Sequence, residues 1–166
     1  DPQKIAVLSN SVLSMLYAVD GKAISRANTT DSLPPEIEAL PALGQTANIN
    51  MEQLLGLNPD LVLGLENQHK KYEAQLQSSK IPTVLINYDG IKDNVPLLTF
   101  LGELTNHQDK AKTVIATYEN NIAKVKDAVK GQQPARVAVL RATGKGVTAE
   151  TDAAITASMV KDLGMT

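Results

Sequence analysis

The chain has 166 residues, of which 43% are hydrophobic and 20% charged, and its formal net charge is −2. These values are typical of a folded domain and argue against disorder. Only 3% of the residues are aromatic, and 18 acidic residues outnumber 16 basic ones, which excludes a nucleic-acid surface of basic and stacking side chains. The lack of cysteine excludes disulfides, zinc fingers, iron–sulfur clusters and thiol catalysis. No apolar run reaches the ~18 residues that a membrane span needs.

The first hundred residues alternate short apolar runs with amphipathic segments. Strands are predicted at 4–8, 23–25, 61–64 and 83–86. Helices are predicted at 12–19, 51–57, 68–78 and 93–104. Asn50 is expected to cap the helix at 51–57 and Pro59 to end it, while the proline-rich stretch 26–43 is predicted to be a loop. Short strands that alternate with helices predict an α/β fold with a parallel sheet.

A long helix is predicted next, at 108–130, because its apolar residues fall on one continuous stripe. At about 1.5 Å per residue it would span ~34 Å, more than a small domain needs. A linker at 131–134, a strand at 136–140 and a helix at 152–163 follow. The pattern therefore predicts an N-terminal α/β lobe at 1–106, a spacer helix at 107–131 and the first strand–helix unit of a second lobe at 132–166.

Polar side chains follow several of the predicted strands. In parallel α/β sheets, ligands bind at the loops that follow the carboxyl ends of strands. We therefore take the side chains in these loops as candidate ligand-binding residues: Ser9, Asn10, Arg26, Glu66, Asn67, Tyr88 and Arg141. The two arginines are candidate partners for an anion. No set of nucleophile, base and orienting group occurs among these residues, so the pattern favours a binding cleft over a catalytic site, and no catalytic residue is predicted.

Two other patterns are candidates for sites of chemistry. His69 and His107 are the only histidines; both are predicted to be exposed, and they are too far apart in sequence to predict a site for a free metal ion. Gly144, Gly146 and Ala149 have the spacing of a dinucleotide-binding fingerprint, but the next helix is predicted to begin only near residue 152. A flexible strand-to-helix loop is the favoured interpretation. An α/β enzyme or nucleotide-binding domain is kept as the alternative function, with a protein-interaction fragment as a third.

The order of several motifs resembles one family. The run 5–11, the pair Leu43-Gly44 and the string N-x-E-x-L-x-x-L-x-P-D-L-V that starts at Asn50 closely resemble the substrate-binding proteins of ABC importers for iron complexes and vitamin B12. Residues 81–86 and 101–105 resemble the family's next strand and the end of its last N-lobe helix. The long helix resembles the rigid backbone helix that joins the two α/β lobes of this class.

The resemblance implies a non-catalytic protein that captures a siderophore complex, haem or cobalamin between two lobes and delivers it to a permease. It implies no cofactor besides that ligand, and a place in the periplasm or at the cell surface. Glu52 is implied to dock on the permease. The loop before the N-x-E string, which often presents an aromatic, Met or Arg to the ligand, here offers Gln45, Thr46 and Asn48. An arginine that some members carry after the strand at 61–64 is replaced by Glu66 and Asn67. This leaves Arg26 as the remaining N-lobe cation for an anionic chelate.

The ends of the chain carry expectations as well. Because the chain begins with Asp1-Pro2 instead of Met, we expect a processed or cut product, with any signal peptide or lipid anchor upstream. Membrane association is expected only through such an anchor. Because only one strand–helix unit follows the spacer, we also expect an intact member to continue past Thr166, and a protein that stops there to bind its ligand weakly or not at all.

Overall fold

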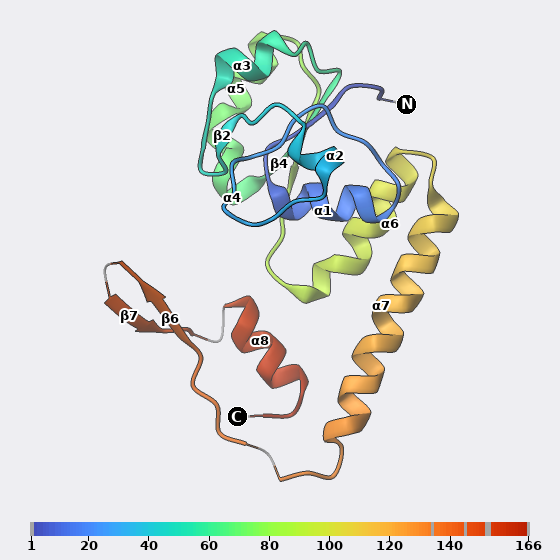
Figure 1. Ribbon diagram of the computed structural model, residues 1–166, viewed down its shortest axis with the longest axis vertical. Helices are drawn as coiled ribbons and strands as arrows, with labels where there is room; N and C mark the ends of the chain where they lie inside the picture. The colour runs from blue at the N-terminus through green and yellow to red at the C-terminus, as the bar shows by residue number, and fades with distance from the viewer. Residues whose placement is uncertain (1, 134, 145, 152–153, 166) are drawn as a thin grey trace. The chain divides into compact units, whose positions relative to one another are not determined.

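The computed structural model describes residues 2–133, 135–144, 146–151 and 154–165 (Figure 1). The chain divides into two compact units. The first contains the residues up to Tyr88 together with Leu97–Val114, and the second contains Asp89–Pro96 and the residues from Ile115 onward. The predicted division into lobes at 1–106 and 132–166 with a spacer between them stays a prediction.

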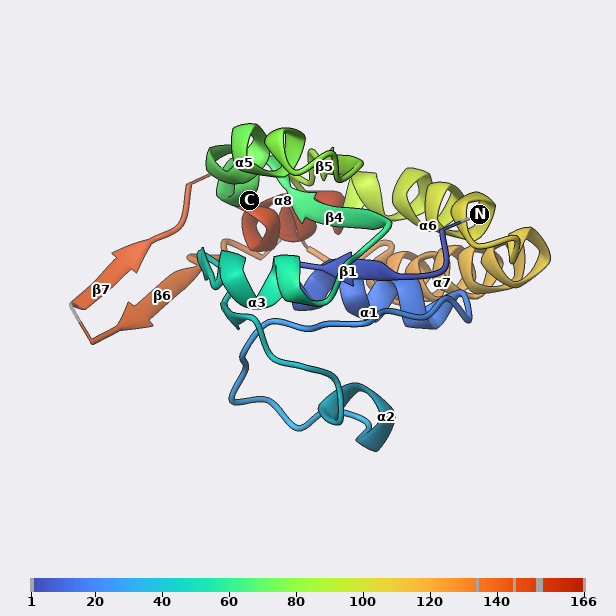
Figure 2. The same cartoon turned by 90° about the horizontal axis from the view of Figure 1, so that it is seen from above.

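The first unit is built on a parallel sheet of three strands, in the order β1-β4-β5 (Figure 2). They are β1 (Ile5–Val7), β4 (Leu61–Leu65) and β5 (Thr83–Ile86). The sequence Leu-Val-Leu-Gly-Leu of the central strand β4 is buried throughout, as expected for a strand that has neighbours on both sides. The predicted α/β fold with a parallel sheet is confirmed.

Helices lie between these strands and after the last of them, at nearly the predicted positions. They are α1 (Asn10–Ala18), α3 (Met51–Gly56), α4 (Glu66–His69), the 3-10 turn η1 (Lys70–Tyr72), α5 (Glu73–Ser78), the turn η2 (Ile91–Asp93) and α6 (Asn94–Leu104). Asn50 caps α3 as predicted, because its side chain accepts a hydrogen bond from the backbone N–H of Gln53 at 3.1 Å. The core contains fully buried leucines from strands, loops and helices: Leu8, Leu13, Leu16, Leu43, Leu54, Leu63, Leu76 and Leu101.

The stretch 23–43 differs from the prediction. Residues 23–25 form no strand, although Ile24 donates to the carbonyl of Ile5 at 2.8 Å. The backbone N–H of Val7 donates to the hydroxyl of Ser25 instead of to a carbonyl, so a side chain interrupts the ladder. The predicted loop at 26–43 contains a short helix, α2 (Pro35–Glu38), and a two-stranded hairpin follows it, formed by β2 (Gly44–Gln45) and β3 (Asn48–Ile49).

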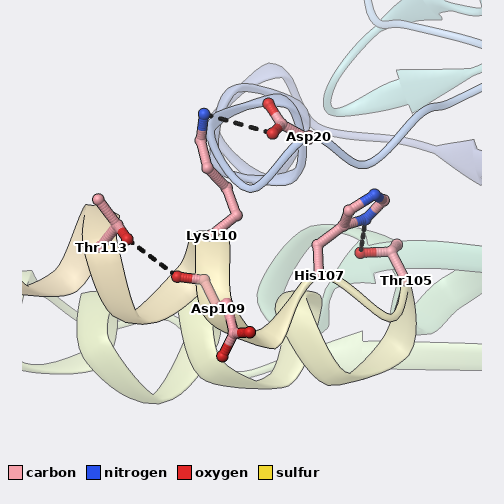
Figure 3. Close-up of polar contacts among 6 residues, drawn as sticks. All are labelled: Asp20, Thr105, His107, Asp109, Lys110 and Thr113. Carbon is pink, nitrogen blue, oxygen red and sulfur yellow. Dashed lines mark hydrogen bonds and ion pairs between the residues drawn. The ribbon is translucent and has the colours of Figure 1, made fainter.

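The long helix α7 (Gln108–Val129) is confirmed within one residue of its predicted bounds. Its first turns are fastened to the first unit (Figure 3). Lys110 forms an ion pair with Asp20 at 3.3 Å, and Ala111 is buried against Gly102 of α6. No helix among the described residues has the length and apolarity that crossing a membrane requires.

In the second unit, the predicted strand at 136–140 is wrong. The strand β6 (Leu140–Thr143) begins where that prediction ends, and it pairs antiparallel with β7 (Gly146–Ala149). A strand forms where a partner is available, and here the partner is the next segment of the chain. The predicted helix at 152–163 is present as α8 (Ile155–Asp162); its proposed first residues, 152 and 153, lie outside the described part of the chain.

Candidate binding site

The carboxyl ends of the three parallel strands bring several of the predicted residues to one edge of the sheet. Ser9 and Asn10 follow β1, Glu66 and Asn67 follow β4, and Tyr88 follows β5. Because β4 is hydrogen-bonded to both other strands, these loops are neighbours. This edge is where parallel α/β sheets bind ligands.

Asn10 uses its side chain to hold a neighbouring segment of the protein. Its Oδ1 accepts from the N–H of Ala27 and its Nδ2 donates to the carbonyl of the same residue, both at 3.1 Å. Ser9 is only 2% exposed. Asn10 therefore holds the segment at Ala27, and the predicted contact of Ser9 and Asn10 with a ligand stays a prediction.

Arg26 lies on the segment that Asn10 fixes, and its guanidinium is half-buried against backbone. Its Nε donates to the carbonyl of Glu38 and its Nη1 donates to the carbonyl of Ala27, each at 3.3 Å. Neither bond involves a carboxylate, so the positive charge of Arg26 is not neutralised by these two contacts. The role predicted for Arg26, binding an anionic chelate, stays a prediction.

The hairpin β2–β3 carries three of the candidate ligand-binding residues. Gln45 and Asn48 are exposed, and Thr46 is half-buried in the turn between the strands. Gly44 begins the hairpin with φ 98°, and a Cβ at this position would lie 2.8 Å from the carbonyl oxygen of Asn48. Glycine is therefore required at the base of this hairpin.

Three side chains that follow β4 hold the hairpin at the carboxyl edge of the sheet. Nε2 of His69 lies 2.7 Å from the carbonyl oxygen of Thr46, and Nζ of Lys71 donates to the carbonyl of Ala47 at 2.6 Å. The hydroxyl of Tyr72 accepts from the N–H of Ile49 at 2.9 Å. Gln45, Thr46 and Asn48 are thereby brought to the edge that also carries Glu66 and Asn67.

His69 corrects the prediction that both histidines are exposed, because its side chain is completely buried. Its Nδ1 accepts from the N–H of Leu65 at 2.7 Å, so the ring proton is on Nε2, which donates to Thr46. Burial lowers the pKa of His69 below its ordinary value of 6.5, with hydrogen bonds to the backbone of Thr46 and Leu65 opposing that shift. The missed signal was the helical spacing of His69, Tyr72 and Leu76, which places the histidine on the face that includes the buried Leu76. His107, as predicted, is exposed, and its Nδ1 contacts the hydroxyl of Thr105 at 3.1 Å (Figure 3).

The remaining predicted residues of the first unit lie on exposed or half-buried surface. Glu66 forms an ion pair with Lys70 at 3.0 Å, and hydrogen bonding to this carboxylate raises the pKa of Lys70. Asn67 is exposed and Tyr88 is half-buried. Glu52 is exposed in the first turn of α3, where a carboxylate also interacts favourably with the helix dipole.

The second unit holds the last candidate residue, Arg141, and the glycine motif. Nε of Arg141 donates to Oε1 of Glu150, across the strands β6 and β7. Gly144, Gly146 and Ala149 belong to this hairpin, with no helix N-terminus directly after the glycines. These residues therefore lack the strand–turn–helix context of a dinucleotide-binding fingerprint. The predicted strand-to-helix loop is also wrong, because β7 lies in its place. Within the described ranges, no three His, Cys, Asp or Glu side chains gather where they could hold a metal ion.

Comparison with known proteins defines the family. A family model described as periplasmic binding protein matches residues 5–166, and the chain belongs to this family. It is 26% identical over 140 residues to the vitamin B12-binding protein of Pectobacterium carotovorum, covering 83% of this chain and 51% of that protein. In an alignment 183 residues long, it is 29% identical to the ferric enterobactin-binding periplasmic protein FepB of Escherichia coli, covering 99% of this chain and 57% of that one. The chain thus spans about half the length of the curated relatives it matches.

Solved structures share the fold. The haem complex of IsdE from Staphylococcus aureus superimposes with a TM-score of 0.85 at 19% identity, over 98% of this chain and 63% of that one. An ABC transporter substrate-binding protein from Listeria monocytogenes gives a TM-score of 0.85 at 17% identity, over 99% of this chain and 64% of that one. These likenesses confirm the α/β architecture that the motif order predicted.

Proposed function

We propose that this chain acts as the substrate-binding component of an ABC importer and performs no catalytic step. The observation that carries the proposal is the family match over residues 5–166. The geometry supports it, because the carboxyl edge of the parallel sheet gathers polar side chains from two strand-end loops and a rigidly held hairpin. A periplasmic or cell-surface location and a permease partner belong to the same proposal.

The ligand we propose is a metal–organic complex: a ferric siderophore, haem or cobalamin. Relatives whose names specify vitamin B12 and ferric enterobactin support this class of ligand. The exposed side chains Gln45, Asn48 and Asn67 offer uncharged donors and acceptors, which suit a large, oxygen-rich chelate held by hydrogen bonds. The metal would arrive as part of the ligand, and no resident cofactor is proposed.

Absorbance titration tests this function directly. The protein is purified with any sequence that its gene encodes beyond residue 166 and is titrated with ferric enterobactin, cyanocobalamin and haemin; a saturable spectral change with one of them is expected. If none of the three changes its spectrum while NAD or ATP raises the melting temperature, the nucleotide-binding alternative replaces the proposal.

Glu52→Ala tests the proposed docking residue. Because Glu52 is exposed on α3, its removal is expected to leave the affinity for the ligand within about twofold. Uptake by cells that depend on this importer should fall severalfold, since the proposed contact with the permease loses its carboxylate. Glu103→Ala, another exposed glutamate, is the matched control and should transport normally. A loss of ligand binding in the Glu52 variant would contradict the docking assignment.

A further inference from the structure

His69 joins two parts of the candidate site that are distant in sequence. It lies four residues after β4, and its two ring nitrogens contact the backbone of Leu65 and of Thr46. We propose that His69 is a positioning residue of the hairpin 44–49, and that its neutral imidazole presents Gln45 and Asn48 to the ligand. The proposal rests on the proposed function.

Both contacts require one tautomer. The backbone N–H of Leu65 can only donate, so Nδ1 must carry a lone pair, and Nε2 must then carry the proton that Thr46 accepts. A second proton on Nδ1 would place two donors against each other and break the bond to Leu65. The two contacts form a bridge from Leu65 through His69 to Thr46. Protonation therefore breaks the contact that fixes this bridge to the sheet.

The surroundings of the ring favour the neutral form. Gly64 lets the ring approach the strand, since a Cβ there would lie 3.1 Å from Nδ1. The ring of Tyr72 stacks on the imidazole with centroids 6.4 Å apart. Lys71 places a positive charge nearby, which disfavours a second proton on the imidazole. The other charged groups of the same segment are Glu66, Lys70 and Glu73, of which Glu66 is paired with Lys70. Strands β2, β3, β4 and β5 contribute no titratable side chain.

A role in packing alone does not account for this residue. A buried leucine would fill the same space, whereas a buried imidazole must be satisfied at both nitrogens to offset its desolvation. Here both partners are backbone groups, one in the sheet and one in the turn of the hairpin. The bridge fixes the height of the turn above the sheet edge, which sets where Gln45 and Asn48 lie.

Two substitutions separate the halves of the bridge. In His69→Gln, the amide can reach as far as Nε2 and donate to Thr46. In His69→Asn, the amide oxygen can replace Nδ1 as acceptor for Leu65, but the side chain is too short to reach the hairpin. Both variants are polar and cannot be protonated at this position. The protein is the one used in the absorbance titration, under conditions where circular dichroism shows each variant to be folded.

The first measurement is amide hydrogen exchange in the hairpin, which needs no ligand. At pH 7.5 the amides of 45–49 should exchange at the wild-type rate in His69→Gln and roughly tenfold faster in His69→Asn, the factor that one lost hydrogen bond produces. Corrected for intrinsic rates, wild-type protection of these amides should fall between pH 7.5 and pH 5.0, whereas that of His69→Gln should not. Equal protection of both variants at both pH values would overturn the proposal.

The second measurement is affinity for ferric enterobactin and for cyanocobalamin at the same two pH values. At pH 7.5, His69→Asn should bind roughly tenfold more weakly than wild type, and His69→Gln within about twofold. On acidification, wild-type affinity should fall more steeply than that of His69→Gln. If wild type binds neither probe, the proposed function fails for these ligands, and the exchange measurement alone decides whether His69 holds the hairpin. Unchanged affinity in His69→Asn would overturn its role toward the ligand.

Discussion

Two side chains of the first unit, Asn10 and His69, each form hydrogen bonds through both of their polar atoms to the backbone of other segments. Asn10 pairs with the N–H and carbonyl of Ala27, and His69 joins Leu65 to Thr46. Each contact lies where a parallel strand has just ended. Polar residues at this edge therefore divide into those that build it and those, such as Gln45 and Asn48, that are exposed on it.

Stability should depend on pH through His69. Burial holds its pKa in the folded state below the ordinary value of 6.5, so the unfolded chain binds more protons between the two values. Above pH 6.5, titration of His69 should not change the free energy of unfolding. Below pH 6.5 this free energy should fall, by at most about 1.4 kcal/mol per pH unit.

Urea unfolding at pH 8.0, 6.5 and 5.0 measures this dependence. His69→Gln should lose less stability than wild type on acidification, and His107→Gln, at an exposed histidine, should follow the wild type. If the free energies of unfolding of wild type and His69→Gln change equally with pH, His69 does not contribute to the pH dependence of stability.

At the scale of elements, α3 is a short helix that depends on its ends. It has six residues, too few to be stable alone, so its cap and its packing decide whether it forms. Asn50 caps its start, and Asn58, with φ 49° in the left-handed region, precedes Pro59 after its end. These signals also fix the orientation of Glu52 in the first turn.

Asn50→Ala removes the cap of α3 and should lower the free energy of unfolding by about 1 kcal/mol. Asn50→Asp keeps an acceptor for the N–H of Gln53 and should stay within about 0.5 kcal/mol of wild type. Urea unfolding of the three proteins at pH 7.5 checks this. Equal losses in both variants would mean that the side-chain cap does not stabilise the helix.

At the scale of the molecule, the start of α7 is fixed to the first unit mainly by close packing. Gly102 of α6 and Ala111 of α7 are both buried and approach closely. The nearby ion pair of Lys110 and Asp20 (Figure 3) is about half exposed and contributes less than about 1 kcal/mol. Steric fit at Gly102 therefore holds the first turns of α7 against α6.

Gly102→Ala should destabilise the chain by about 1–3 kcal/mol, because the added Cβ would lie 2.5 Å from the Cβ of Ala111 and force the helices apart. Gly56→Ala is the matched control, since no atom lies within 4 Å of a Cβ there. That change should be neutral or stabilise by up to about 1 kcal/mol. Thermal and urea unfolding of both variants decide between steric fit and a general intolerance of glycine replacement.

The sequence alone determined the features that depend on local chemistry. The buried strand at 61–64, the cap at Asn50 and the apolar stripe of α7 follow from periodicity and from side chains that act within a few residues. The order of these motifs was enough to indicate the family. The assignment of individual side chains to the ligand, from Ser9 to Arg141, stays a prediction.

Only the tertiary structure decided which groups meet across long stretches of chain. The burial of His69 depends on Thr46, 23 residues away, and the missing ladder at 23–25 depends on the bond between Ser25 and Val7. The hairpin β6–β7 replaced a predicted parallel strand because the adjacent segment supplied the hydrogen-bond partners. Periodicity shows which face of a segment is apolar, but the partner of a buried polar group comes from another part of the fold.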